Sequence, residues 1–552
     1  MRTITDEASV RVVPVAVKRP RGAKLAPWAW CVALFVLYGT LSVQRHRLLR
    51  TTGYDLGIFE QAVKAYSQLQ APYVPLKGDG GAVNLLGDHF HPVLAVLGPL
   101  YRLAPAAETL LLAQAALLAL AVVPLARWAQ RVLGRAAAHV VALGYGLSWG
   151  IASAVTFDFH EVAFAVPLLA FSLEALGRER YGRAVALAAP LLLVKEDLGL
   201  TLAALGAYVA WKGRQGRRKA EWALGLATVA AGALGTLLIT RVLLPALNSS
   251  GTYAYGEYVA EGGRGSLLAT LVAAPLDALR PEVKAVTLVL VLAPTALLAL
   301  RSPLVLLAAP TLGWRLLSRH SYHWDTAFHY SAVLMPIVFA ALIDALTPYA
   351  RTNASTSTGA SPSTSTGASP STSPSPSIST KDDERAARHL RASLATVVAV
   401  TLVLLPSFPF GLVLRKDTWR TTDHVRAARA LLDRIPDGAT VAASNRLVPQ
   451  LAARCTAVLF PGYPIPGKLY DTDGTPPPPT SEWIIHDSRP HEAWPLPDGH
   501  WPYPLDRQQD ELARAQQSYG YRVVAREDGI TLLRKETGSG AGGAGGAETS
   551  IR

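Results

Sequence analysis

The sequence has little cysteine and little charge. Of its 552 residues only Cys31 and Cys455 are cysteines, which excludes a disulfide framework. Charged residues make up 17%, against about 25% in soluble domains, while apolar types reach 50%. This composition excludes a disordered protein, a coiled coil and an ordinary soluble enzyme. Because the apolar residues gather in long runs, it indicates a polytopic membrane protein.

Several functional motifs are also missing. The chain has no P-loop, no GxGxxG after a strand and no GxSxG elbow, which disfavours a nucleotide-driven mechanism. It has no Arg-rich voltage-sensor helix and no selectivity-filter sequence. The net charge of +13 comes from short basic clusters beside apolar runs. That is the pattern of the positive-inside rule, so we expect no nucleic acid partner.

Eleven apolar stretches are candidate membrane spans, since a span needs about 20 apolar residues. Eight clear stretches begin near Pro27, Glu108, Ala136, Val162, Ala220, Ala285, Ser331 and Ser393. Three shorter stretches cover residues 183–194, 198–211 and 302–317. Basic loops alternate with non-basic ones, which predicts a cytoplasmic N-terminus and an extracytoplasmic C-terminal region.

The predicted organisation is an all-α membrane protein with a small extracytoplasmic α/β domain at its C-terminus. The segments are a cytoplasmic tail (1–26), a transmembrane core (27–348) with its first extracytoplasmic loop at 45–107, a disordered Ser/Thr/Pro-rich cytoplasmic linker (349–392), a last span (393–414), the α/β domain (415–536) and a disordered tail (537–552).

Nearly every Asp, Glu and His close to a span falls on the predicted outer face, in the strings GYDLGIFEQ, NLLGDHFHP, FDFHE, VKED and RHSYHWDTAFHY. A charged group at the centre of a membrane helix costs roughly 2.5–3.5 kcal/mol unless it faces water or a partner. Several such clusters on one side therefore predict a shared, water-filled cavity.

Each cluster has a structural and a functional interpretation. Asp55 precedes an amphipathic stretch expected along the membrane surface, so it either caps that helix or acts chemically. NLLGDHFHP suits metal ligation, and FDFHE suits either metal ligation or a hydrogen-bonded cluster at a helix end. VKED suits a phosphate site or an ion-paired turn, and RHSYHWDTAFHY suits an anionic ligand or inert loop histidines. The residues concerned are Asp88, His89, His91, Asp158, His160, Glu161, Lys195, Glu196, Asp197, Arg319, His320, His329 and Tyr330.

These strings, in this order, closely resemble a bacterial family of predicted membrane proteins, domain of unknown function twenty-seventy-nine. The resemblance runs from about residue 54 to 345, and a weaker similarity covers the segment VAASNRLVPQLAAR. The set is specific because five separate strings appear in the expected order. The family in turn resembles the C-type (GT-C fold) glycosyltransferases, integral membrane enzymes that use polyprenyl-phosphate sugars.

The resemblance implies a fold and a site. The catalytic Asp of those enzymes lies in the first extracytoplasmic loop at the start of a surface helix, where this chain has Asp55. Asp55 would then be the general base of an inverting transfer. Lys195 and His329, with Arg319 behind them, would hold the departing lipid phosphate, and the other candidates would shape the sugar and acceptor pocket.

The implied partners are a polyprenyl-phosphate donor in the bacterial plasma membrane and a glycan, lipid or protein acceptor in the cell envelope. No cofactor is expected. The motif here is Tyr-Asp-Leu-Gly rather than a pair of acids, which disfavours a metal-dependent mechanism.

Two other functions fit the sequence. A transporter or flippase for a lipid-linked or anionic solute would share the outer cavity, but alternating access also needs an inner gate. A non-catalytic scaffold that presents the outer domain would tolerate Asp55→Ala apart from its stability. Polarity on one side only favours the enzyme.

Overall fold

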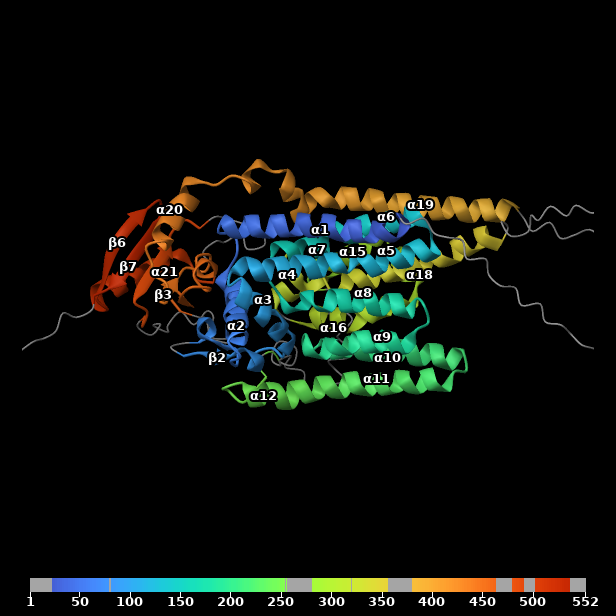
Figure 1. Ribbon diagram of the computed structural model, residues 1–552, viewed down its shortest axis with the longest axis horizontal. Helices are drawn as coiled ribbons and strands as arrows, with labels where there is room; N and C mark the ends of the chain where they lie inside the picture. Colours follow the sequence, from blue (N-terminus) through green and yellow to red (C-terminus); the bar gives the residue numbers. More distant parts are fainter. Residues whose placement is uncertain are drawn as a thin grey trace, which may run out of the picture.

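The computed structural model describes residues 22–78, 81–253, 255, 280–318, 320–355, 380–462, 479–490 and 502–536. The predicted tails at 1–21 and 537–552 and most of the Ser/Thr/Pro-rich linker, at 356–379, lie outside the described residues. Figure 1 shows a bundle of helices running side by side, with a β-sheet at one end. We call this end the sheet end and the other the opposite end.

Five described segments are long and apolar enough to cross a membrane, and a sixth is a pair of helices bent by 43°. The five segments are Lys24–Arg47, Ala107–Val132, Lys219–Leu247, His329–Ala350 and Asp383–Ser407, and the bent pair is Arg135–Gly146 with Trp149–Thr156. All six coincide with predicted spans, so the chain is a multi-span membrane protein. The helices that form them are α1 (Gly22–Arg47), α4 (Ala107–Leu120), α5 (Val122–Val132), α6 (Arg135–Gly146), α7 (Trp149–Thr156), α11 (Lys219–Leu238), α12 (Leu244–Leu247), α18 (Leu334–Ser355) and α19 (Thr380–Leu404).

The expected count of eleven spans is not confirmed, because the helices at the other five predicted spans are too short or, for residues 198–215, not apolar enough to be counted with these six. They correspond to α8 (Ala165–Leu176), α9 (Tyr181–Ala188), α10 (Leu198–Gln215), α15 (Glu282–Leu292) and α16 (Ala309–Leu317). Proline lies in the 3-10 turns that follow α9 and α15 and precede α16, at Pro190, Pro294 and Pro303. Proline lacks a backbone N–H and interrupts the regular α-helical ladder, which shortens these helices.

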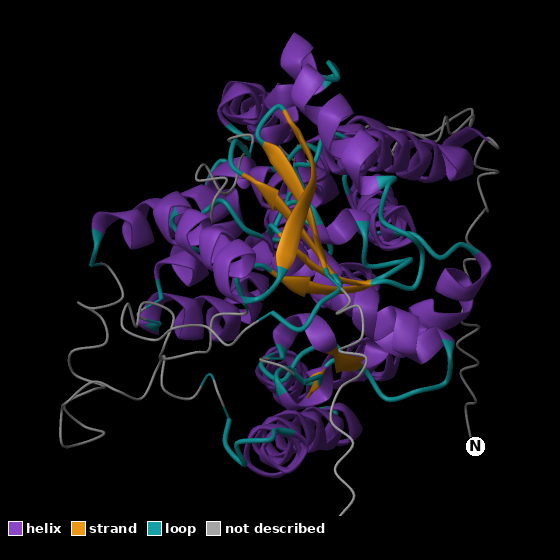
Figure 2. Cartoon of the chain, turned by 90° about the vertical axis from the view of Figure 1, so that its left-hand side faces the viewer, coloured by secondary structure: helices purple, strands orange, loops and turns teal. Residues whose placement is uncertain are grey.

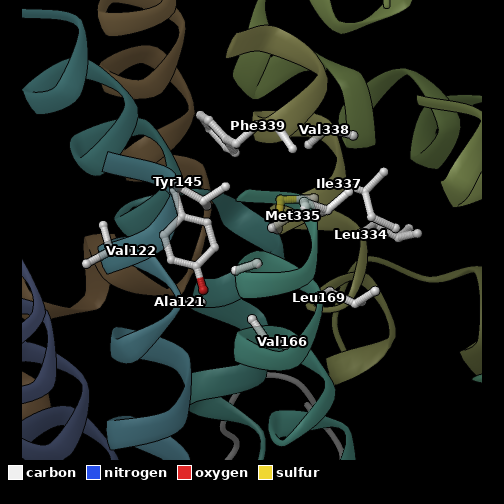
Figure 3. Packing of buried hydrophobic residues seen from close by; sticks show 14 of the residues in the cluster. Ala121, Val122, Tyr145, Val166, Leu169, Leu334, Met335, Ile337, Val338 and Phe339 are labelled. Atoms are coloured by element: carbon white, nitrogen blue, oxygen red, sulfur yellow. The ribbon is translucent and has the colours of Figure 1, made fainter. Parts of the chain in front are cut away.

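The core of the bundle surrounds α18. Side chains from α4 to α8 and α18 form one cluster of buried apolar residues. Figure 3 shows its centre, where Met335 and Phe339 of α18 lie beside Tyr145 of α6. The rings of Tyr145 and Phe339 are 6.1 Å apart and nearly perpendicular, and the Tyr145 hydroxyl donates to the Leu118 carbonyl at 2.8 Å. The buried hydroxyl is therefore satisfied, as an apolar core requires.

The segment between α1 and α4 lies between the bundle and the sheet. It begins with a π-helical turn, η1 (Gly53–Gly57), which leads into the amphipathic helix α2 (Ile58–Ser67). Two short antiparallel strands follow, β1 (Tyr73–Val74) and β2 (Val83–Asn84), and then α3 (Gly98–Leu103). Figure 1 shows α2 crossing the sheet end of the bundle, steeply inclined to the helices.

The C-terminal region is a mixed five-stranded sheet of order β4-β3-β5-β7-β6. Its parallel part joins β3 to β4 and β5, and its antiparallel part joins β7 to β5 and β6. Figure 2 looks onto this sheet from the left-hand side of Figure 1. The elements are α20 (Asp423–Leu432), β3 (Thr440–Ala443), β4 (Thr456–Leu459), β5 (Trp483–Asp487), α21 (Leu505–Ser518), β6 (Tyr521–Glu527) and β7 (Ile530–Lys535).

The two faces of the sheet are covered by different parts of the chain. One face packs on α21 through a small cluster that includes Ile484, Leu512 and Leu533. The other shares a larger cluster with α2, in which Phe59 and Val63 join Val441 and Val448. The amphipathic stretch at residues 56–66 is thus a helix, as expected, but Phe59 and Val63 on its apolar side are buried against the C-terminal region rather than left for the membrane surface.

Candidate functional site

The candidate site lies at the sheet end, where five segments distant in the sequence meet. They are η1, the loop after β2, the loop between α7 and α8, the turn before α10 and the start of α18. Each is a connection or an element end, which places its polar side chains beyond the apolar middle of the bundle. Of the fourteen candidates, Arg319 lies outside the described residues.

Asp55 lies inside the turn η1 rather than at its start. Its side chain is 28% exposed, and its Oδ2 is 3.5 Å from Nε2 of His160. The residue that precedes α2 is Gly57, and no side chain caps this helix start. This geometry does not favour the capping interpretation, and it leaves the carboxylate accessible to a ligand.

Two stacked imidazoles lie behind Asp55. The ring centroids of His160 and His329 are 3.5 Å apart, and the Phe157 ring stacks on both, with centroids 5.1 Å from His160 and 6.1 Å from His329. Both histidines are buried. Nδ1 of His160 and both ring nitrogens of His329 find no hydrogen-bond partner among the described residues. Buried polar atoms without partners are rare, and they mark places where a ligand or water completes the structure.

Lys195 supplies a buried positive charge beside the histidines. Its Nζ is 2.9 Å from Oε1 of Glu161. Burial opposes both charges, but each stabilises the other. Lys195 holds the pKa of Glu161 at about 2 against the effect of burial, and the carboxylates of Glu161 and Glu196 raise the pKa of Lys195. The pair is therefore ionised at neutral pH.

The other acidic residues of the site also have partners. Glu196 Oε1 is 2.7 Å from Nδ1 of His89 and accepts from the hydroxyl of Tyr253 at 3.2 Å. Asp88 pairs with Lys77, which outweighs burial and holds the Asp88 pKa at about 2.

Two tyrosines beyond α12 complete this part of the site. Besides the bond from Tyr253 to Glu196, the Tyr255 hydroxyl donates to Asp88 at 3.1 Å, and its ring stacks on His89 with centroids 4.2 Å apart. Neither tyrosine was expected from the sequence, because their segment carries no charged motif that would set it apart.

Asp158 supports the turn that carries Asp55. Its carboxylate accepts from the backbone N–H of Thr52 at 3.0 Å and from the Thr52 hydroxyl at 2.5 Å. Asp158 is buried with φ +47°, and Gln114 bonds its carbonyl at 2.6 Å. Burial raises the pKa of Asp158 to about 6, although the hydrogen bonds from Thr52 oppose this rise.

The remaining candidates lie at the margins of the site. His91 is buried with its ring edge-on to Phe59, and burial lowers its pKa to about 4. Asp197 accepts from Nε1 of Trp314 at 2.9 Å, and burial raises its pKa to about 6. Tyr330 follows His329 directly. His320 contacts Tyr322 and His323 rather than the Asp55 group.

A second buried cation, Arg315 of α16, was not a candidate from the sequence. Its guanidinium donates to Ser331 Oγ at 3.1 Å and to the Tyr330 carbonyl at 3.3 Å. Its Nη2 finds no partner among the described residues. Arg315 lies four residues before Arg319, within the apolar stretch 302–317 that was predicted to be a membrane span. It was therefore not considered as a site residue. Within the described part of the chain, no group of three or more His, Cys, Asp or Glu side chains is arranged to hold a metal ion.

Comparison with known proteins identifies the family. The chain belongs to the family described as Predicted membrane protein (DUF2079), which matches residues 45–532. This confirms the family predicted from the sequence motifs. No curated protein matches the chain.

Several solved structures are similar to this chain, among them the two that follow. ArnT from Cupriavidus metallidurans bound to undecaprenyl phosphate is 13% identical, with 92% of this chain and 98% of that chain covered and a TM-score of 0.49. The archaeal oligosaccharyltransferase AglB from Archaeoglobus fulgidus, in complex with an inhibitory peptide and a dolichol-phosphate, is 10% identical, with 92% and 74% covered and a TM-score of 0.42. Both TM-scores lie below 0.5, so neither match bears on the activity of this chain.

Proposed function

We propose that the protein is an integral membrane glycosyltransferase that moves a sugar from a polyprenyl-phosphate donor to an acceptor outside the cytoplasm, with inversion. The observation that carries this proposal is the placement of Asp55. A partly exposed carboxylate lies in front of buried histidines with unpartnered nitrogens, and buried cations lie close behind them. The resemblance of the Asp55 motif to the catalytic loop of C-type glycosyltransferases supports the same assignment.

Asp55 is the general base in this mechanism. As an acceptor hydroxyl attacks the anomeric carbon, its proton passes to the Asp55 carboxylate and a new C–O bond forms. The bond between the anomeric carbon and the phosphate oxygen breaks, and its electron pair leaves with the polyprenyl phosphate. A positioned general base contributes typically 10²–10⁴-fold to such a step. Attack from the side opposite the leaving group inverts the anomeric centre.

The leaving phosphate gains negative charge, so it needs fixed cations and hydrogen-bond donors. Lys195 supplies a buried ammonium, and His329 supplies ring nitrogens that have no partner among the described residues. Arg315 joins them as a buried guanidinium that contacts the residues following His329. In this arrangement Arg315 takes the supporting role that the sequence assigned to Arg319.

The acidic and aromatic residues beside the phosphate group form the sugar and acceptor pocket. Asp88, His89 and Glu196 are held in place by Lys77, Tyr253 and Tyr255. The buried residues His91, Asp158, His160 and Glu161 and the partly buried Asp197 and Tyr330 complete or support the walls, while His320 lies farther out against Tyr322 and His323. Carboxylates and phenols are suited to the hydroxyls of a sugar, because they combine strong acceptors with donors.

The test is release of polyprenyl phosphate by the purified protein in nanodiscs. The donors are a mixed pool of polyprenyl-phosphate sugars, and the acceptor is a cell-envelope extract. We expect Asp55→Asn to lower release at least 100-fold, while donor binding changes little. The matched control is Glu108→Gln, a carboxylate at the sheet end that is 34% exposed. It leaves release within twofold of the wild type.

Each other outcome contradicts part of the proposal. Release that is unaffected by Asp55→Asn removes Asp55 from its role, and a product with retained configuration removes the single-displacement step. Donor binding without any release from the pool favours a transporter or flippase, which a donor-flipping assay in liposomes then tests. Absence of both release and donor binding overturns the proposal.

A further inference from the structure

We infer that the C-terminal α/β region holds the Asp55 turn in its reactive position, with Asn445 as the positioning residue. This inference rests on the proposed function, but its structural part can be tested without activity. Asn445 lies two residues beyond the end of β3, in the segment VAASNRLVPQLAAR that shows the weaker similarity to the family.

Asn445 bonds two successive amides of the turn. Its carbonyl oxygen accepts from the Gly53 N–H at 2.7 Å, and its Oδ1 accepts from the Tyr54 N–H at 3.1 Å. Both N–H groups belong to the first residues of a helical turn, where no intrahelical partner exists. One residue of the C-terminal region therefore supplies the acceptors that the turn itself lacks. Asp55 is the next residue along the chain.

The turn is fixed from the other side as well. Thr52 donates its N–H and its hydroxyl to Asp158, in the loop between α7 and α8. The three residues before Asp55 are thus bonded to two different parts of the fold. With its backbone anchored in this way, the Asp55 carboxylate can remain partly exposed without an anchoring hydrogen bond of its own.

At Gly53 the backbone of the turn lies so close to the Val448 side chain of the C-terminal region that only glycine fits. A Cβ on Gly53 would lie 2.6 Å from Cβ of Val448, and one on Gly57 would lie 3.0 Å from Cγ1 of Val448. Contacts under 3.0 Å require one of the two parts to move. Val448 therefore packs against both glycines that flank Asp55, and any shift of this side chain is passed to the turn.

The contact continues along α2 as a shared core. Leu56 and Phe59 are buried in the same cluster as Val448 and Leu451, and Gln61 Nε2 donates to the Ala457 carbonyl of β4 at 2.7 Å. The α/β region is therefore packed onto the site rather than tethered beside it. Misplacing a reacting group by about 1 Å can cost about 100-fold in rate, so this packing bears directly on catalysis.

The first experiment uses Asn445→Ala in the full-length protein in nanodiscs. We expect kcat to fall between tenfold and 100-fold while KM for the donor stays within twofold, because the phosphate-binding groups are untouched. Asn445→Asp keeps an acceptor for the Tyr54 N–H and restores most of kcat. The matched control is Lys64→Met, which removes another bond between α2 and the C-terminal region, from Lys64 Nζ to the Ala452 carbonyl at 3.2 Å. It leaves kcat unchanged.

A second readout does not depend on turnover. Asn445→Ala removes the side-chain acceptor of the Tyr54 N–H and keeps the backbone carbonyl that accepts from Gly53. Hydrogen exchange at the Tyr54 amide therefore rises in Asn445→Ala and not in Lys64→Met. If the wild type shows no turnover, the proposed function fails, while this measurement still decides whether Asn445 anchors the turn. Unchanged exchange overturns the anchoring. Raised exchange with unchanged kcat overturns the positioning role.

A suppressor pair covers the case in which Asn445→Ala does not fold. Gly57→Ala brings a methyl group to 3.0 Å from Cγ1 of Val448 and 3.1 Å from Cδ2 of Leu76, which shifts the turn by a few tenths of an ångström and lowers kcat. Adding Val448→Ala removes that Cγ1 and restores kcat towards the value of Val448→Ala alone. Additive losses in the double variant would contradict a coupling through this contact.

Discussion

The two ends of the helical bundle treat their charged residues differently. At the opposite end, Glu174 of α8 accepts from Arg178 at 2.5 Å and lies 3.4 Å from Arg131 of α5. One carboxylate there serves two cations that are about a quarter to a third exposed. At the sheet end, Lys195 and Glu161 form a pair that is almost fully buried, next to imidazoles whose nitrogens lack described partners.

This difference distinguishes charged residues that stabilise the fold from charged residues that serve a function. The cluster around Glu174 pairs a buried carboxylate with two partly exposed cations. The sheet end bears the cost of burying ions and polar rings without satisfying all of them, which costs about 1–3 kcal/mol for each unmet group. A fold retains such groups where a ligand meets them, and departures from good local structure are expected at functional sites. Substitutions at either end of the bundle test this difference.

Lys195→Met should have the largest effect. It leaves the Glu161 carboxylate buried without its partner, and breaking a buried pair from one side costs about 3–5 kcal/mol of unfolding free energy. The double variant Lys195→Met/Glu161→Gln removes both charges and should recover most of that loss, while polyprenyl-phosphate release stays low. Thermal unfolding and release measured on the same nanodisc samples check both parts. If release recovers together with stability, the role of Lys195 is structural only.

Asp158 should make stability depend on pH. Burial raises its pKa from 3.8 to about 6, so the folded protein holds this proton more tightly than the unfolded chain does. Its contribution to the unfolding free energy is full below pH 4 and is lost as pH rises through 6, by up to about 3 kcal/mol. Asp158→Asn should lose this contribution, while that of Asp197, whose pKa burial also raises to about 6, remains.

The control for Asp158 is Asp88→Asn. Lys77 overcomes burial and holds the pKa of Asp88 at about 2, which is below the measured range. Thermal unfolding from pH 4 to 7 should therefore give a nearly constant difference between this variant and the wild type. A wild type whose stability over this range is parallel to that of Asp158→Asn would contradict the raised pKa.

His329→Phe should separate turnover from stability. Phenylalanine keeps a flat ring on His160 and removes two nitrogens that have no described partner, so we expect the unfolding free energy to change by about 1 kcal/mol or less. Release should fall about 100-fold, because a group proposed to meet the leaving phosphate is lost. The measurement is kcat in nanodiscs beside thermal unfolding. A stability loss of several kcal/mol would show that the imidazole has a partner in the folded protein.

The sequence predicted the sheet end better than the span count. Five charged strings indicated one shared face, and the structure joins most of them through contacts such as His160–Asp55, Lys195–Glu161 and His89–Glu196. Charge beside an apolar run is a strong local signal. The count of eleven is not confirmed, in part because hydropathy does not show where a proline such as Pro190 or Pro294 divides a run into an α-helix and a 3-10 turn.

Other features of the site were beyond sequence reasoning for a different reason. Tyr253 and Tyr255 reach Glu196 and Asp88 only because α11 and α12 return the chain to the sheet end. Asn445 reaches the Asp55 turn across 391 positions of sequence. Such contacts depend on tertiary packing, which a single sequence without its fold does not reveal. The sequence around Asn445 showed a weak resemblance to the family, but it did not show that Asn445 contacts the Asp55 turn.

Arg178→Ala at the opposite end should have the smallest effect. Glu174 keeps Arg131 nearby, and the lost pair is about one third exposed, so we expect a loss of about 1 kcal/mol or less in unfolding free energy. Release per folded molecule should match the wild type, because no contact leads from Glu174 to Asp55. Thermal unfolding and release in the same nanodiscs check this, with Arg218→Ala, at another exposed pair of this end, as the control. A tenfold loss of release in Arg178→Ala would contradict the conclusion that only the sheet end takes part in turnover. Both ends would then belong to one functional unit, as alternating access requires.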